Sequence, residues 1–259
     1  MTDPREPDSV FVAFQILTSE SPEQWDVRVV KSIDRGDTFT LGGGELNPDP
    51  VTPADDVRAA RGPQLRNGVF IDYFAAEDGW HYLVYEDEGL VYFTRAQPID
   101  PVPGFPPLDG LAWIEPVRVS IPDSPSLGVR NVQPAVAGLG SRVVVTYYEQ
   151  SLAGNDASTY VVARVSDDQG DTWRTTTMSR NDAGDTLMFE PCTLQNRPTE
   201  SYFGDYIDVQ PLSLPTLPDT GFFVTWTDSR VPPGETGDSC AESTSLNAVH
   251  HHTYGATVR

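Results

Sequence analysis

The chain has 259 residues, a hydrophobic content of 38% and a formal net charge of −21 at pH 7. This length fits one large domain or two small ones, and so acidic a surface disfavours nucleic acid and anionic membranes as partners. No apolar run approaches the roughly 18 residues of a membrane span, and no signal-peptide pattern is visible, so we expect no membrane insertion. The 23 prolines and 21 glycines are typical of many short strands and turns, which predicts an all-β fold.

Residues 1–9 are polar and contain two prolines, which predicts a disordered N-terminal end. From residue 10 onward one pattern of strands and turns recurs four times, which predicts a single domain over 10–259. Each repeat contains a run rich in β-branched and aromatic residues, as expected of a buried strand. These four runs begin at Val10, His81, Val143 and Phe222. The predicted repeats span about 10–41, 63–120, 131–178 and 202–259.

The first repeat leads to an octapeptide at 32–39 and is followed by a Gly-, Pro- and Asp-rich connector over 42–62. The second has predicted strands at 69–73, 81–85 and 91–93 and ends in a degraded copy of the octapeptide near Trp113. The third is the most regular, with predicted strands at 133–138, 143–148, 160–165 and 174–178. The fourth opens near Tyr202, passes through 222–226 and finishes on 253–259.

The octapeptide has the form Ser-x-Asp-x-Gly-x-Thr-aromatic and occurs twice in full. Its residue types fit a tight turn between antiparallel strands, because Asp accepts hydrogen bonds from nearby backbone N–H groups and Gly adopts a positive φ. We expect the Ser and Thr hydroxyls to bind free backbone groups, and the final aromatic ring to enter the core. The residues are Ser32, Asp34, Gly36, Thr38 and Phe39 in the first copy, and Ser166, Asp168, Gly170, Thr172 and Trp173 in the second.

This octapeptide resembles the Asp-box, or BNR repeat, of sialidase-like β-propellers. The pairing of Phe203–Ile207 with Trp226–Arg230 is similar to a pattern of exported bacterial BNR-repeat proteins. The resemblance covers about residues 10–259 and implies a β-propeller of four-stranded blades, with an extracellular or cell-surface location. In that family the Asp-box is a structural turn on the side of the propeller away from the catalytic face.

The two ends of the repeat pattern predict an irregular or incomplete ring. The first repeat begins with its second strand, and the fourth ends with its third strand. A propeller normally closes by pairing strands from both ends of the chain. We therefore expect either part of a longer propeller or an irregularly closed four-repeat ring. Open blade edges of this kind also predict self-association.

The resemblance implies a site on the face opposite the Asp-boxes. In sialidases, arginines bind the substrate carboxylate, a Tyr–Glu pair is the nucleophile and an Asp is the acid/base, which suits an oxocarbenium-like transition state. By position, the candidate substrate-binding residues are Arg66, Arg130, Arg197 and Arg230, and the candidate catalytic residues are Asp205 and Tyr206. The family's Phe/Tyr-Arg-Ile-Pro motif is absent. The same residues also have a structural interpretation, as surface or loop-bracing arginines, a turn Asp and a packed Tyr, and this interpretation is favoured.

Two functional hypotheses follow. The first is a sialidase-like, carbohydrate-directed propeller that binds glycans, with or without glycoside hydrolysis. The second is a non-catalytic interaction or scaffolding propeller, since propellers support many activities. We expect no cofactor and no metal, because His250–His252 supplies at most two side chains to one face of a strand. Cys192 and Cys240 are compatible with a disulfide or with two thiols.

Overall fold

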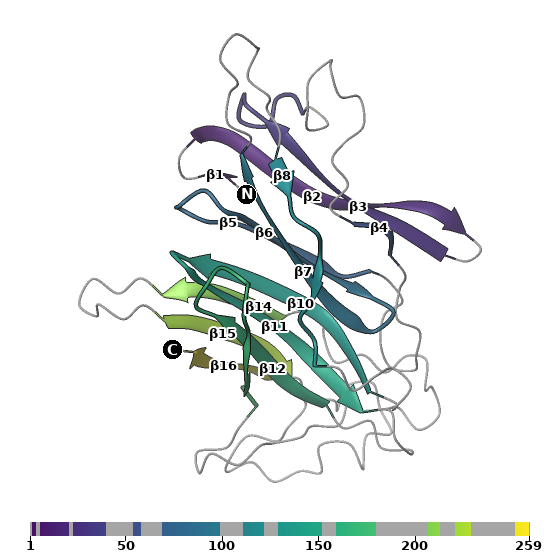
Figure 1. Cartoon of the computed structure of the whole chain (residues 1–259), viewed down its shortest axis with the longest axis vertical. Helices are drawn as coiled ribbons and strands as arrows, with labels where there is room; N and C mark the ends of the chain where they lie inside the picture. Colours follow the sequence, from purple (N-terminus) through teal and green to yellow (C-terminus); the bar gives the residue numbers. More distant parts are fainter. Residues whose placement is uncertain are drawn as a thin grey trace.

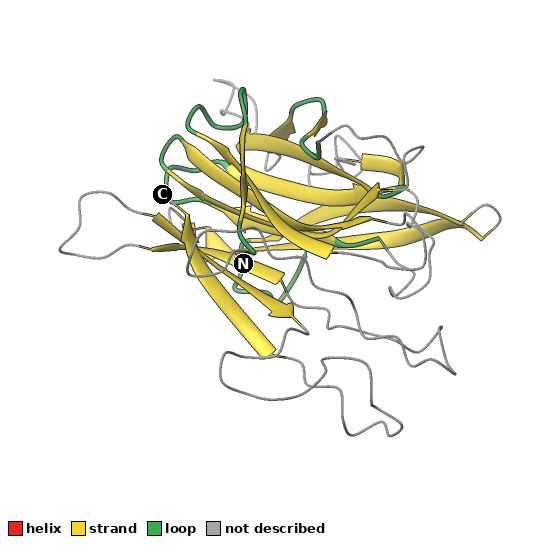
Figure 2. Ribbon diagram, turned by 90° about the horizontal axis from the view of Figure 1, so that it is seen from below, coloured by secondary structure: helices red, strands yellow, loops and turns green. Residues whose placement is uncertain are grey.

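The computed structural model describes residues 2–3, 6–20, 23–39, 54–57, 69–98, 111–121, 129–151, 159–179, 207–212, 221–228 and 252–258. These residues form strands and turns, with no helix among them. The strands build several antiparallel sheets, as Figures 1 and 2 show. The prediction of an all-β fold is confirmed.

The strands fall into four sheets, which we number I to IV in chain order. Sheet I contains β1 (Thr2–Asp3), β2 (Glu6–Glu20), β3 (Glu23–Ser32) and β4 (Ala54–Val57) in that spatial order. Sheet II contains β5 (Ile71–Ala75), β6 (His81–Asp87), β7 (Leu90–Pro98) and β8 (Leu111–Trp113), with β9 (Val117–Arg118) also paired to β7. Sheet III contains β10 (Val129–Leu139), β11 (Arg142–Ser151), β12 (Thr159–Ser166) and β13 (Arg174–Thr177). Sheet IV contains β14 (Ile207–Leu212), β15 (Gly221–Asp228) and β16 (His252–Val258).

Sheet III shows why the central runs of the sequence are continuously apolar. Its strand β11 is buried at every position from Val143 to Tyr148. Side chains on one face of this strand pack against sheet II, and those on the other face pack against sheet IV. A strand covered on both faces needs apolar residues at successive positions rather than at alternate ones.

The sheets pack face to face in chain order through three apolar cores. One core joins sheets I and II around Phe11, Tyr73 and Leu83. A second joins sheets II and III, and a third joins sheets III and IV. Figure 1 shows sheet I at the upper end of the long axis and sheets III and IV in the lower half, with sheet II between them.

Three features of the backbone differ from the sequence-based expectation. Strands β1 and β2 occupy part of 1–9, where we expected a disordered end, because β2 extends four residues ahead of the apolar run. Strand β4 lies inside the expected connector and pairs with β3, although its sequence Ala-Asp-Asp-Val carries little strand signal. In β10 the register shifts between Val132 and Ala135, where Gln133 has a φ of 53°.

Candidate functional site

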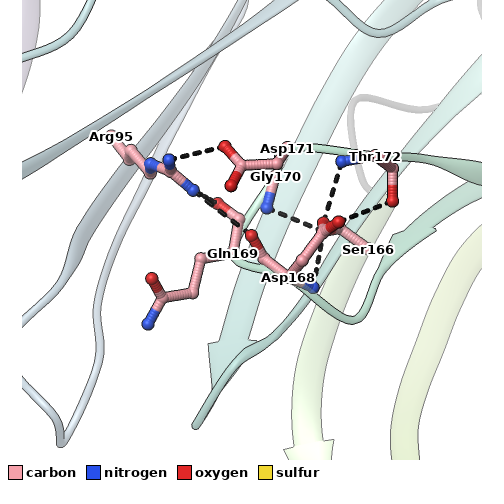
Figure 3. A network of polar contacts seen from close by, with 7 residues as sticks. All are labelled: Arg95, Ser166, Asp168, Gln169, Gly170, Asp171 and Thr172. Atoms are coloured by element: carbon pink, nitrogen blue, oxygen red, sulfur yellow. Dashed lines mark hydrogen bonds and ion pairs between the residues drawn. The ribbon is translucent and has the colours of Figure 1, made fainter.

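The two Asp-box turns have the same internal hydrogen bonds. In the second copy, the Ser166 hydroxyl oxygen accepts from the backbone N–H groups of Asp168 (3.2 Å) and Gly170 (2.7 Å) and donates to the Asp168 carboxylate (2.6 Å). That carboxylate also accepts from the backbone N–H of Thr172 at 2.8 Å and from its hydroxyl at 2.6 Å (Figure 3). Each bond recurs in the first copy between the corresponding residues.

The turn geometry explains which Asp-box predictions are correct. Gly36 and Gly170 have φ values of 96° and 104°, as predicted for the glycine of this turn. The Ser hydroxyls bind backbone groups as expected, but each Thr hydroxyl donates to the Asp carboxylate instead of a backbone group. These bonds lower the pKa of both Asp34 and Asp168 to about 2, with the Ser hydroxyl as the largest cause. The acids are therefore ionised acceptors in a structural turn.

The aromatic residues that close the two turns have different surroundings. Trp173 packs against the core between sheets II and III, and its ring meets the edge of Phe93 at a centroid distance of 5.1 Å. Phe39 is 46% exposed, so the prediction that its ring enters the core is wrong. The difference arises because the second turn meets a preceding sheet, whereas sheet I is the first in the stack.

The second Asp-box also fastens sheet III to sheet II. Arg95 on β7 donates hydrogen bonds to the carbonyl oxygen of Gln169 and to the carboxylate of Asp171, the latter at 2.7 Å. Figure 3 shows its guanidinium reaching across from the neighbouring sheet to the outside of the turn. The same guanidinium carbon lies 5.1 Å from the centre of the Trp80 ring, a cation–π contact. The second Asp-box turn therefore connects sheets II and III, in addition to joining strands β12 and β13.

We predict that Gly170→Ala destabilises the fold more than Gly140→Ala does. Both glycines have positive φ, but the 57° of Gly140 lies in the left-handed region that alanine can adopt, whereas the 104° of Gly170 lies outside it. A Cβ at Gly170 would overlap the ring of Phe93, whereas a Cβ at Gly140 would have nothing within 4 Å. The expected difference is about 1–3 kcal/mol, the usual cost of overpacking. Urea unfolding of the two variants measures it, and equal losses would contradict a role for the turn in sheet packing.

A buried polar cluster lies at the other end of sheet III from the Asp-box. Ser166 pairs with Val143 at the start of β11, whereas Arg130 pairs with Gln150 near its end. The Arg130 side chain donates from Nε to Oε1 of Gln150 at 2.7 Å, and both residues are at most 3% exposed. Burial lowers the pKa of Arg130, and the nearby negative charge of Glu86 opposes that shift.

Glu86 connects this cluster to sheet II. It lies at the end of β6, is 1% exposed, and accepts a long hydrogen bond of 3.4 Å from the backbone N–H of Gln133. Asn131, which follows Arg130 in the sequence, donates from its backbone N–H to the carbonyl oxygen of Gly89 at 2.7 Å. Together these contacts hold the β10 bulge against the β6–β7 turn. Arg130 thus belongs to a buried polar cluster at the contact between sheets II and III, with its Nε bonded to Gln150 and its charge close to that of Glu86.

A second acid lies on the first strand of sheet II. Asp72 on β5 accepts a hydrogen bond from the backbone N–H of Val136 on β10 at 2.8 Å. Burial raises the pKa of Asp72 to about 6, and the charge of Asp208 on β14 contributes in the same direction. Asp72 therefore changes its protonation state near neutral pH while in contact with the neighbouring sheet.

Of the residues predicted for the site, the structure places Arg130 and all ten Asp-box residues. The other candidates, Arg66, Arg197, Asp205, Tyr206 and Arg230, lie outside the described residues, as do Cys192 and Cys240. Sequence reasoning missed Asp72, Glu86 and Gln150, which stand inside or beside apolar strand runs. A buried acid or amide in such a run is itself a signal, because it requires a polar partner.

Among the described residues, no group of three or more His, Cys, Asp or Glu side chains is arranged to hold a metal ion. Nor does that part of the chain contain a helix of the length and apolarity needed to cross a membrane. The sequence matches no protein-family model and none of the curated proteins with which it was compared.

Proposed function

We propose that the chain is a sialidase-type β-propeller that binds carbohydrate at the end of the sheets opposite the Asp-boxes. The observation that carries this proposal is the repeated Asp-box joint. Each turn is held against its own sheet by a backbone bond, from Arg35 to Asp8 in sheet I (3.0 Å) and from Gln169 to Ser141 in sheet III (2.7 Å). Turns committed to packing leave the opposite end of the sheets for a ligand.

The polar residues near that end support binding more than catalysis. A retaining glycosidase needs two carboxyl groups about 5–5.5 Å apart, together with groups that fix the sugar. Arg130, the one candidate arginine among the described residues, is engaged with Gln150 and is buried. We therefore propose glycan recognition without efficient hydrolysis, with Arg66, Arg197, Asp205, Tyr206 and Arg230 as the remaining candidates for ligand contact.

The expected result is weak binding in a glycan screen and no enzyme-like turnover of a fluorogenic sialoside. Arg197→Ala should weaken glycan binding, because an arginine fork is the natural partner of a sugar carboxylate. Arg142→Ala is the matched control, since Arg142 lies at the Asp-box end and pairs with Asp167 at 2.6 Å. Robust turnover that Arg197→Ala abolishes would contradict binding without hydrolysis. Failure to bind any glycan would favour the scaffolding alternative.

The scaffolding alternative has its own support. Large apolar side chains are exposed on the outer sheets of the stack, among them Val12, Ile16 and Phe223. Exposed apolar side chains gathered on one surface are typical of protein-interaction sites.

A further inference from the structure

The stacking of the sheets gives every sheet two distinct faces. We call the face that packs on the next sheet in chain order the forward face, and the face that packs on the preceding sheet the rear face. Sheets II and III have both faces covered. Sheet I uses its forward face against sheet II, and sheet IV uses its rear face against sheet III. In the part of the chain that the structure describes, one face of each terminal sheet therefore has no other sheet packed against it.

The free forward face of sheet IV carries the same kind of anchor as the covered forward faces. Phe11, Tyr82, Val144 and Phe223 occupy corresponding positions, each the second residue of its aligned run. The first three are 3%, 0% and 0% exposed because the next sheet covers them, whereas Phe223 is 39% exposed. The ring of Phe223 lies over Gly255, where a Cβ would approach it to 2.5 Å.

The first strands of sheets II and IV, β5 and β14, also carry matching residues. Asp72 pairs with Val84 in sheet II, and Asp208 pairs with Thr225 at the same register in sheet IV. The Asp72 carboxylate accepts a backbone N–H from the following sheet, whereas the side chain of Asp208 is exposed. Sheet IV thus has the apolar side chain (Phe223) and the hydrogen-bond acceptor (Asp208) that contact the next sheet elsewhere, but no following sheet covers them in the part of the chain that the structure describes.

The free rear face of sheet I matches the covered rear faces. Its Val12 corresponds to Leu83, Val145 and Val224, which are all 0% exposed in the other three sheets, yet Val12 is 39% exposed. Two residues further along, Phe14 corresponds to the aromatic residues Tyr85, Tyr147 and Trp226. Ile16 continues the same side of β2 and is 43% exposed. The rear face of sheet I is therefore the kind of surface on which the forward face of another sheet packs.

We propose that the forward face of sheet IV packs on the rear face of sheet I of a second copy of this chain. In each contact within the chain, the forward face of one sheet packs on the rear face of the next. The two free faces, one forward and one rear, are complementary in the same way. Sheet I lies at the far end of the long axis from sheet IV in Figure 1, which favours a second copy over the same molecule. The contact joins unlike faces and is therefore heterologous, so it extends from one copy to the next beyond a dimer unless the assembly closes into a ring. This inference does not depend on which ligand the chain binds.

Net charge opposes this association and makes it dependent on salt. Each copy carries a formal charge of −21, so two copies repel each other at low ionic strength. At about 0.5 M NaCl the Debye length falls to roughly 4 Å, and the apolar contact between the faces then dominates. We expect the proportion of associated chains to rise with salt as well as with protein concentration.

Sedimentation velocity in about 0.5 M NaCl, with the Debye length then roughly 4 Å, tests the proposal. The full chain should form concentration-dependent dimers and longer oligomers, and Phe223→Asp or Val12→Asp should each leave a monomer. Ile33→Asp is the matched control, because Ile33 is exposed on the first Asp-box turn rather than on either face, and it should still associate. Both face residues are partly exposed, so circular dichroism and melting should be unchanged in the variants.

Mixing the two monomeric variants gives the decisive result. The Val12→Asp copy keeps an intact sheet IV face and the Phe223→Asp copy keeps an intact sheet I face, so an equimolar mixture should regain dimers through one contact. A mixture that stays monomeric would overturn the pairing of unlike faces. A wild-type chain that is monomeric at all concentrations would overturn the proposal.

Discussion

Replacing Arg130 with Met should lower the free energy of unfolding by about 3–5 kcal/mol, the usual effect of removing one partner from a buried charge pair. The substitution removes the 2.7 Å hydrogen bond from the arginine to Gln150. It also leaves Glu86, at 1% exposure, without the positive charge that faces it. The carboxylate must then stay buried and uncompensated, or take up a proton at a cost.

Urea unfolding at pH 7 measures this effect, with Arg142→Met as the matched control. Arg142 forms an ion pair of 2.6 Å with Asp167, and both side chains are substantially exposed. Such a surface pair contributes at most about 1 kcal/mol. Adding Glu86→Gln to Arg130→Met should restore part of the loss, because it removes the uncompensated charge. Equal losses for Arg130→Met and Arg142→Met would show that the buried cluster does not hold sheets II and III together.

Asp72→Asn should stabilise the protein above pH 6, by up to about 3 kcal/mol. Burial raises the pKa of Asp72 from 3.8 to about 6, so the folded protein binds this proton more tightly than the unfolded chain does. The stability that the group contributes is therefore complete below pH 3.8, and it is lost as the pH rises through 6. A shift of roughly two pKa units corresponds to about 3 kcal/mol. Asn removes the charge and keeps an oxygen to accept the Val136 N–H.

Melting temperatures measured from pH 4 to pH 8 test this sign. The stabilisation by Asp72→Asn should vanish near pH 4, where the wild-type carboxyl is protonated. Asp208→Asn should have a smaller effect in the same direction, because Asp208 is exposed but its charge contributes to the raised pKa of Asp72. A stabilisation independent of pH, or a loss of stability at pH 8, would show that Asp72 is not held in a desolvated, charged state.

The sequence predicts best where the determinants of structure are local. The strands of sheet III follow from continuous β-branched runs, and both Asp-box turns follow from residues within eight positions of each other. Strand β4 could not be foreseen, because its pairing with β3 comes from a neighbouring backbone and not from its own polar residues. The short β1 is a similar case.

The polar contacts between sheets could not be predicted for a related reason. Arg95 meets Gln169, 74 positions along the chain, and Gln133 meets Glu86, 47 positions away. Nothing in either local sequence specifies the other partner. Arg130 was correctly placed at the end opposite the Asp-boxes, because strand direction alone determines that. Its burial against Gln150 depends on side-chain packing, which strand direction does not determine.

The Tyr148 hydroxyl joins sheets III and IV in a way that limits how they can move. Its oxygen donates to the carbonyl oxygen of Thr227 and accepts from the N–H of the same residue, both at 3.0 Å. Sliding of β15 along β11 by one residue would break both bonds at once. The Tyr148 hydroxyl therefore fixes the position of β15 along β11 as well as holding the two sheets together.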